Sequence, residues 1–149
     1  MNVDVRGVYL CSYYFLPQML AQHYGTIINM SSVSGLLGDT DMVAYNTAKG
    51  AITNMTRCMA IDYAKDGIRV NAIAPGFFST NQNKTLLYNE DGSLTPRSEK
   101  ILSHTPLRRF GVPQDLTGTL LYLCDEAYAG FVTGIIVPVD GGFSAYSGV

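Results

Sequence analysis

The sequence predicts a parallel α/β sheet covered by helices, and two observations support this fold class. Three short runs, TIINM, IRVNAIAPG and FVTGIIVPVDGG, have the continuous apolar character that is typical of buried parallel strands. Longer segments with apolar residues three or four positions apart separate these runs, and this spacing is typical of helices. Strands that alternate with helices indicate a parallel sheet.

The first half of the chain predicts two long helices, each followed by a strand. A well-buried helix is expected over residues 3 to 22, with Pro17 perturbing its interior, and Gly25 then leads into a strand at 26–30. A loop is expected over 31–41 and a second helix over 43 to 65, which Gly67 stops. The second strand covers 68–76. The apolar stripe of the second helix consists of Ala48, Ile52, Met55, Met59 and Ala64.

The second half predicts a polar segment, a helix and a third strand. Residues 77–110 contain one short helix, at about 97 to 103, and such a long irregular stretch in a compact domain is usually functional. Pro113 opens a helix that extends to residue 129, and the third strand covers 131–140, with a glycine pair after it. Three strands leave an apolar edge unpaired, so either a partner covers that edge or the sequence is a fragment.

Composition limits the classes of function that need to be considered. The chain has 149 residues, of which 47% are hydrophobic, and a formal net charge of -2. These values favour a single globular domain over 1–149 and provide no basic field for nucleic acid or a membrane surface. No apolar run reaches the length of about 18 residues that a membrane span requires. We expect a cytoplasmic protein.

The cysteines and histidines argue against a metal site. Cys11, Cys58 and Cys124 are widely spaced, with no CxxC pair, and the chain has only two histidines. This pattern excludes a Cys/His zinc site and disfavours disulfides. We expect each cysteine to be a reduced, buried apolar residue.

Tyr45 and Lys49 are candidates for acid/base chemistry. They lie four residues apart at the start of an expected helix, on one face and one turn apart. A fixed cation near a phenol favours its phenolate form, which makes the phenol a usable acid and base. On spacing alone, an accidental surface pair is the alternative.

Ser32 and the APGFFST segment follow the first and second strands. The carboxyl ends of parallel strands are where open α/β sheets bind their ligands. A Ser32 hydroxyl there can hydrogen-bond a substrate oxygen, whereas its simpler interpretation is a loop serine. The simpler interpretation of APGFFST is a Pro-Gly turn.

These segments together resemble a known family. INMSSVSG, AYNTAKGAI, IRVNAIAPGFFST, RFGVPQDL and FVTGIIVPVDGG resemble, in order and spacing, the short-chain dehydrogenase/reductase family, over nearly the whole chain. The resemblance implies the C-terminal portion of a Rossmann-type doubly wound parallel sheet, whose N-terminal βαβ units this chain lacks. It also implies an NAD(P)-dependent oxidoreductase that acts on alcohols and ketones and forms a homodimer or homotetramer through its two long helices.

The resemblance assigns roles to individual residues. Ser32 would stabilise the reacting oxygen, Tyr45 would transfer the proton, and Lys49 would tune Tyr45 and hold the nicotinamide ribose. The resemblance places four further residues at the nicotinamide carboxamide: Pro75, Gly76, Phe78 and Thr80. NAD and NADP stay open, because the residue that discriminates them follows a strand outside this sequence.

Two departures from the family pattern affect these expectations. Asp4 occupies the position of a family asparagine, and an ionised carboxylate cannot donate a hydrogen bond as an amide does. We therefore expect Asp4 to alter the family's water-linked proton relay. The glycine-rich turn that binds the pyrophosphate has no counterpart here, so the chain alone is expected to bind the cofactor weakly or not at all.

A narrower resemblance concerns the substrate. The segment from Pro75 to Gly111 and the ending DGGFSAYSGV are similar to the D-mannonate oxidoreductase (fructuronate reductase) branch of the family. A sugar-acid carboxylate could be bound by Arg97, Arg108 or Arg109, and hydroxyls by Asn81, Gln82 or Asn83. For each arginine taken singly, the pattern favours a solvated surface role. The alternative function is a truncated, non-catalytic remnant that only associates with partner subunits.

Overall fold

The computed structural model describes residues 1–148 and contains one sheet of three parallel strands. Its strands are β1 (Gly25–Met30), β2 (Ile68–Pro75) and β3 (Ile136–Val139), in the order β1-β2-β3. The expected α/β class and the parallel sheet are confirmed. Among the described residues β1 pairs on one side only, with β2, so its other edge is open, as expected.

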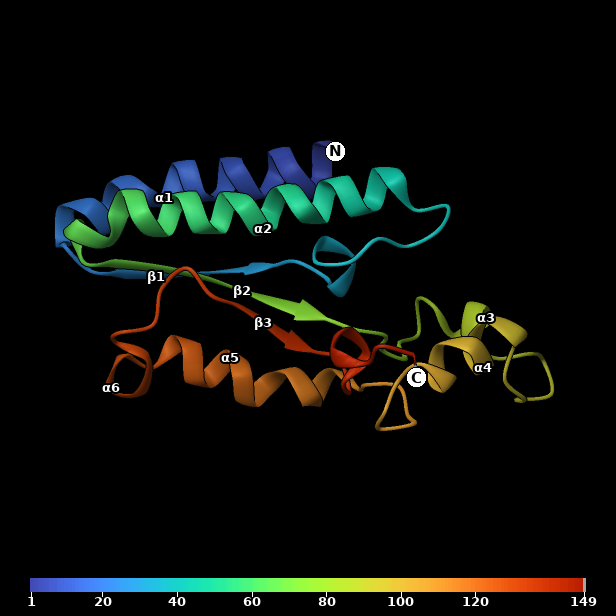
Figure 1. Ribbon diagram of the computed structural model, residues 1–149. Coiled ribbons are helices and arrows are strands. Elements are labelled where there is room, and N and C mark those ends of the chain that lie inside the picture. The colour runs from blue at the N-terminus through green and yellow to red at the C-terminus, as the bar shows by residue number, and fades with distance from the viewer. Residues whose placement is uncertain (149) are drawn as a thin grey trace.

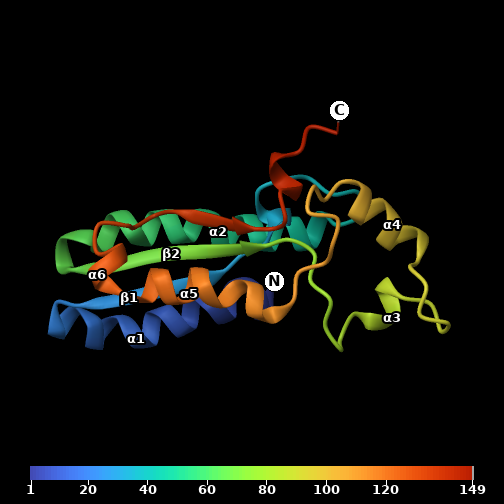
Figure 2. The same cartoon turned by 90° about the horizontal axis from the view of Figure 1, so that it is seen from below.

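Helices cover both faces of this sheet (Figure 1). The long helices α1 (Val8–Gln22) and α2 (Val43–Tyr63) lie side by side on one face, and α5 (Thr117–Cys124) lies on the other, as the second view confirms (Figure 2). Both long helices run opposite to the strands, so their N-terminal ends lie at the carboxyl edge of the sheet. Beyond that edge lie α3 (Lys84–Leu87) and α4 (Pro96–Ser103).

The expected first helix differs from α1 in two ways. Its first turns, Asn2–Gly7, form a π-helix, η1, which contacts α2, and Pro17 lies inside α1 without ending it. The expectation that this helix is well buried is wrong, because its only buried residues are Ser12 and Leu16. Its tyrosines and Phe15 are exposed because a single stripe of the helix faces the sheet.

The third strand is shorter than expected, and Asn71 explains the difference. The expected strand covered 131–140, but only Ile136–Val139 are extended in the sheet. The fully buried Asn71 side chain donates to the Val132 carbonyl (2.9 Å) and accepts from the Ile135 amide (3.1 Å). A side chain therefore takes the place of sheet pairing at this point, and Gly134 turns the chain with φ of 79°.

The expected helix after Pro113 is divided into three parts. A 3-10 turn over Pro113–Leu116 leads into α5, and α6 (Glu126–Ala129) follows a break at Asp125. Asp125 has extended backbone geometry, and its carboxylate accepts from the Ala127 amide at 2.8 Å. A side chain that caps a new helix end competes with continuation of the old helix, which explains the break.

The core lies between the long helices and the sheet. Leu16 and Met59 pack there against residues of β2, whereas Leu87, Ile101 and Phe110 form a smaller cluster within the 77–110 segment. The expected stripe of α2 holds at Ala48, Ile52 and Met59, which are buried, while Ala64 is exposed.

The cysteines differ from expectation. Cys11, Cys58 and Cys124 are unpaired, but all three are exposed on helix surfaces, so the prediction that they are buried apolar residues is wrong. Residues 1–148 contain no cluster of potential metal ligands and no helix that is long and apolar enough to cross a membrane.

Asn71 provides a test of this packing. Asn71→Ala leaves the Val132 carbonyl and the Ile135 amide without their partner, and we expect the free energy of unfolding to fall by about 2 to 4 kcal/mol. Urea denaturation of the chain measures this loss. Asn54→Ala, on the exposed face of α2, is the control, and equal stability of the two variants would contradict the role of Asn71.

Candidate active site

Ser32 lies directly after β1, at the carboxyl edge of the sheet. Its hydroxyl oxygen accepts a hydrogen bond from the Ser34 amide at 3.2 Å and begins the 3-10 turn η2 (Val33–Gly35). The side chain is largely buried, and within residues 1–148 its own proton has no acceptor. Ser32 therefore has a positioned hydroxyl proton that remains available to a ligand.

The neighbouring serine has a structural role. The Ser31 hydroxyl donates to the Lys49 carbonyl at 3.1 Å and lies 2.7 Å from the Thr53 hydroxyl. These contacts attach the end of β1 to α2. Ser31 and Ser32 therefore have different roles. Ser31 holds β1 and α2 together, whereas the hydroxyl proton of Ser32 is available to a ligand.

Gly35 permits the close packing of η2 against α2. A Cβ atom at this position would lie 2.7 Å from the Lys49 carbonyl oxygen, closer than any side chain tolerates. Sequence analysis did not identify this residue, although a glycine three positions after Ser32 in SSVSG was the available signal. Gly35 thus sets the distance between the serine turn and the helix that carries Tyr45.

Tyr45 and Lys49 occupy the first two turns of α2, as predicted. The Lys49 ammonium lies 5.6 Å from the centre of the Tyr45 ring. Tyr45 is 39% exposed, whereas Lys49 is only 9% exposed. The phenol is accessible to a ligand, and a nearly buried cation lies beside it.

The Lys49 ammonium has two further partners, each from a different element. It donates to the Met30 carbonyl at the end of β1 (3.3 Å) and forms an ion pair with the Asp4 carboxylate in η1 (3.0 Å). The structure therefore brings together Asp4, Tyr45 and Lys49 from two helices, next to the strand that precedes Ser32.

The Pro-Gly turn ends β2 at the same edge of the sheet. The Gly76 amide donates to the Val139 carbonyl at 3.0 Å, and a Cβ atom on Gly76 would lie 2.7 Å from the Asp140 side chain. Gly76 is therefore required for β2 and the DGG segment to approach each other. A hollow of about 230 Å³ adjoins this turn and is lined in part by Phe77, Phe78 and Asp140.

The turn after Phe78 is organised by Asn83. Its side-chain oxygen accepts from the Thr80 amide (2.9 Å) and the Thr80 hydroxyl (3.1 Å), and its side-chain nitrogen donates to the Phe78 carbonyl (2.7 Å). The side chain of Asn83 thus forms hydrogen bonds that hold this turn together. Asn81 and Gln82 are exposed, and no hydrogen bond of their side chains is formed within residues 1–148.

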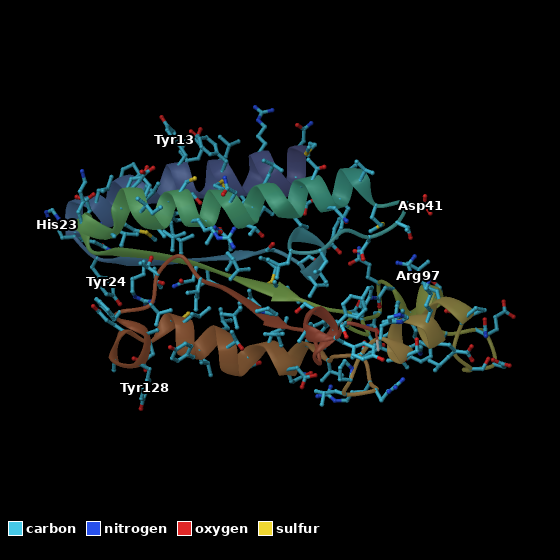
Figure 3. All side chains as sticks on the ribbon, in the orientation of Figure 1. Tyr13, His23, Tyr24, Asp41, Arg97 and Tyr128 are labelled. Carbon is cyan, nitrogen blue, oxygen red and sulfur yellow. The ribbon has the colours of Figure 1, made fainter. Side chains whose placement is uncertain are left out.

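The three candidate arginines lie in different environments. Arg109 forms a bidentate pair with Asp115, with distances of 2.6 and 3.1 Å. Arg108 donates to the Leu102 and Ser103 carbonyls near the end of α4. Arg97 is exposed and has no hydrogen bond or ion pair within the described residues. Its side chain extends from α4 on the side that faces the segment before α2 (Figure 3).

The Arg109 pair shifts the pKa of both partners so that each favours its charged form. Hydrogen bonding to Arg109 lowers the pKa of Asp115 to about 2, and the same hydrogen bond raises the pKa of Arg109. Both groups therefore stay ionised throughout the neutral range. Arg109 stabilises the start of the Pro113 turn, where Asp115 also accepts from the Val112 amide.

The donors at this edge fit one end of a dinucleotide. An ammonium has three N–H donors, so Lys49 keeps one for a ribose hydroxyl after its bonds to Asp4 and Met30. A pyrophosphate normally lies on a glycine-rich turn at a helix N-terminus, and residues 1–148 contain no such turn between a strand and a helix. The residues present fit the nicotinamide-ribose end.

Comparison with known proteins identifies the family. A family model described as Enoyl-(Acyl carrier protein) reductase matches residues 1–144. The chain belongs to the short-chain dehydrogenase/reductase family. Its members are oxidoreductases that use NAD or NADP, which confirms the resemblance that the motifs indicated.

Relatives within the short-chain dehydrogenase family match nearly the whole chain. A Bacillus subtilis protein named uncharacterized oxidoreductase UxuB is 56% identical over 99% of the chain and 53% of its own length. A Haemophilus influenzae structure with bound NAD, described as a candidate D-mannonate oxidoreductase, is 48% identical, with a TM-score of 0.94, over 99% of this chain and 53% of that one.

A more distant structure has the same fold. Gluconate 5-dehydrogenase from Burkholderia cenocepacia, in complex with NADP and tartrate, is 32% identical, with a TM-score of 0.88, and the match covers 97% of this chain and 55% of that one. The chain therefore spans about half the length of the relatives that it matches.

Gly35 provides a test of how this short-chain dehydrogenase site is built. Gly35→Ala forces η2 away from the Lys49 carbonyl, and we expect the free energy of unfolding to fall by about 1 to 3 kcal/mol. Gly38→Ala is the matched control, because a Cβ atom there has no neighbour within 4 Å. Urea denaturation compares the two, and a loss of stability in both or in neither would contradict the close approach at Gly35.

Asp115 makes a pH-dependent contribution to stability. Because its pKa in the folded chain is about 2 and the ordinary value is 3.8, the pair stabilises the chain above about pH 4. This contribution is lost as the pH falls towards 2. We therefore expect the urea midpoints of wild type and Asp115→Asn to converge between pH 5 and about 2. A difference that is constant with pH would contradict the ion pair.

Proposed function

We propose that this chain is the catalytic half of an NAD(P)-dependent short-chain dehydrogenase that interconverts a sugar-acid ketone and alcohol. The observation that carries the proposal is the Lys49 ammonium, nearly buried and 5.6 Å from the ring of the accessible Tyr45. A positioned cation beside an accessible proton donor stabilises the anion that proton transfer leaves behind, so this placement supports a chemical role.

Each residue of the site has one proposed step. In the direction of reduction, Ser32 donates a hydrogen bond to the substrate carbonyl oxygen, and Tyr45 transfers its phenolic proton to that oxygen. Lys49 stabilises the phenolate that remains. When bound, the nicotinamide cofactor supplies or accepts the hydride.

The cofactor is proposed to lie along the carboxyl edge of the sheet. Lys49 would hold the ribose through its remaining N–H, and the turn from Pro75 to Thr80, including Gly76 and Phe78, would line the carboxamide. Thr80 can take part through the lone pairs of its hydroxyl, since Asn83 already accepts its proton. Because the residues present fit only the nicotinamide-ribose end of the dinucleotide, we expect the chain alone to bind it weakly.

The substrate class is inferred from two kinds of support. One is the description of the Haemophilus influenzae relative, and the other is Arg97, which lacks a partner in the described residues and could bind a carboxylate bidentately. Asn81 and Gln82 offer amides for substrate hydroxyls. Arg108 and Arg109 already have partners, which favours Arg97 among the three arginines.

The test uses a completed enzyme. The chain is fused behind the N-terminal half of the Haemophilus influenzae relative, and oxidation of NADH or NADPH is measured with D-fructuronate and with uncharged D-fructose. We expect turnover of the acid in preference to the sugar. No turnover of any ketone would contradict the proposed function, whereas equal turnover of both would contradict only the substrate class.

Tyr45 provides a test of the chemical step. In the completed enzyme we expect Tyr45→Phe to lower kcat by at least about 10²-fold, the usual contribution of a general acid, because only the transferable proton is removed. Cofactor affinity should remain close to that of wild type. The control is Tyr128→Phe, on the exposed surface of α6. A Tyr45→Phe enzyme that retains its kcat would show that another group transfers the proton.

Arg97 provides a test of specificity. Losing an arginine that binds a desolvated carboxylate costs a few kcal/mol, so Arg97→Ala should lower kcat/KM for the acid by about 10²-fold. The kcat/KM for the uncharged ketone should change little. Arg108→Ala is the matched control, because Arg108 donates to main-chain carbonyls near α4. If Arg108→Ala has the larger effect on the acid, the assignment of Arg97 is wrong.

A further inference from the structure

We infer that Asp4 is the positioning residue of this site: its direct ion pair with Lys49 fixes the ammonium so that a single N–H faces the cofactor. The inference rests on the proposed function for its consequence in catalysis. The ion pair itself can be tested in the chain alone.

The number of N–H donors on the ammonium limits the directions in which it can bind. Of its three N–H groups, one is directed to Asp4 at 3.0 Å and one to the Met30 carbonyl at 3.3 Å. A lysine side chain has a flexible four-carbon stem, and one contact would leave the direction of its remaining donors free. Two contacts from different elements fix the direction of the third N–H donor.

The buried charge of Lys49 also requires a partner of opposite charge. The Lys49 side chain is 11% exposed, so an unpaired ammonium there would carry a large desolvation cost. The Met30 carbonyl is neutral and offsets only part of that cost. Asp4, whose side chain is 39% exposed, supplies the opposite charge while keeping its own contact with water.

The carboxylates of the loop before α2 are engaged elsewhere or directed away from Lys49. Asp39 accepts from the Ser34 hydroxyl at 2.6 Å, and Asp41 points away from the sheet at the tip of its loop (Figure 3). Within residues 1–148, Lys49 forms an ion pair with Asp4 and with no other carboxylate. The π-helical turns of η1 therefore bring the required carboxylate to α2.

The ion pair predicts the reactivity of Lys49 in the isolated chain. Competitive acetylation of the four lysines by acetic anhydride, quantified by mass spectrometry, compares Lys49 with Lys65, Lys84 and Lys100 as internal references. We expect Asp4→Ala to raise the relative acetylation of Lys49 by about fivefold. Asp4→Asn should give a smaller increase, because its amide oxygen can still accept a hydrogen bond. Asp62→Asn, on the exposed surface of α2, is the charge-matched control and should match wild type.

Two outcomes of the labelling would overturn the inference. One is a relative acetylation of Lys49 that is the same in wild type and Asp4→Ala. The other is an equal increase in Asp62→Asn. Unfolding would also raise the relative acetylation of Lys49, because Lys65, Lys84 and Lys100 are already exposed, so far-UV circular dichroism checks that each variant is folded. If Asp4→Ala is unfolded, the isosteric Asp4→Asn variant decides: a rise at Lys49 in the folded variant supports the pair, and no rise refutes it.

The catalytic consequence is tested in the completed enzyme. A lysine whose third donor is no longer directed binds the ribose less well, so Asp4→Ala should raise the KM for the cofactor by about fivefold or more, with a smaller change in kcat. Asp4→Asn should restore part of the cofactor affinity. An unchanged KM would contradict the positioning role. If selective labelling is observed but the wild-type fusion turns over no ketone, the ion pair stands and the proposed function fails.

Discussion

The pairing of one nearly buried cation is the interaction on which the site depends. The Lys49 ammonium contacts Asp4 in η1 and the Met30 carbonyl in β1. The main-chain carbonyl of Lys49 accepts a hydrogen bond from the Ser31 hydroxyl. An unpaired charge at this position would be costly, so the three elements must meet at one point. The absence of a side chain at Gly35 in turn lets the serine turn lie against the Lys49 carbonyl in the first turns of α2.

The same reasoning separates structural polar residues from those available to a ligand. Asn83, Arg108, Arg109 and Asp115 form hydrogen bonds that hold the segment beyond β2 in place. Ser32 retains a hydroxyl proton and Tyr45 is accessible, while Arg97 has no partner in the described residues. We therefore assign the chemistry and the substrate contacts to the residues at the carboxyl edge whose polar groups are not used in hydrogen bonds that hold the fold together.

Much of this arrangement could be predicted from the sequence. The continuous apolar runs located β1 and β2, and the four-residue spacing placed Tyr45 and Lys49 on adjacent turns of one helix. The remaining features depend on contacts between residues distant in sequence. Asn71 shortens β3 by bonding across about sixty positions, and no local pattern reveals such a bond. Asp125 illustrates a different difficulty, because an aspartate suits both a helix interior and a cap, and only the folded chain decides between them.

The account is tested most directly by a crystal structure of the completed enzyme with NAD bound, in which the distance between the Lys49 Nζ and the Asp4 carboxylate is measured. The account predicts a direct contact near 3 Å, with the third donor of Lys49 directed to a ribose hydroxyl. A water molecule between the two charged groups, or a Lys49 side chain turned away from both Asp4 and the ribose, would contradict it.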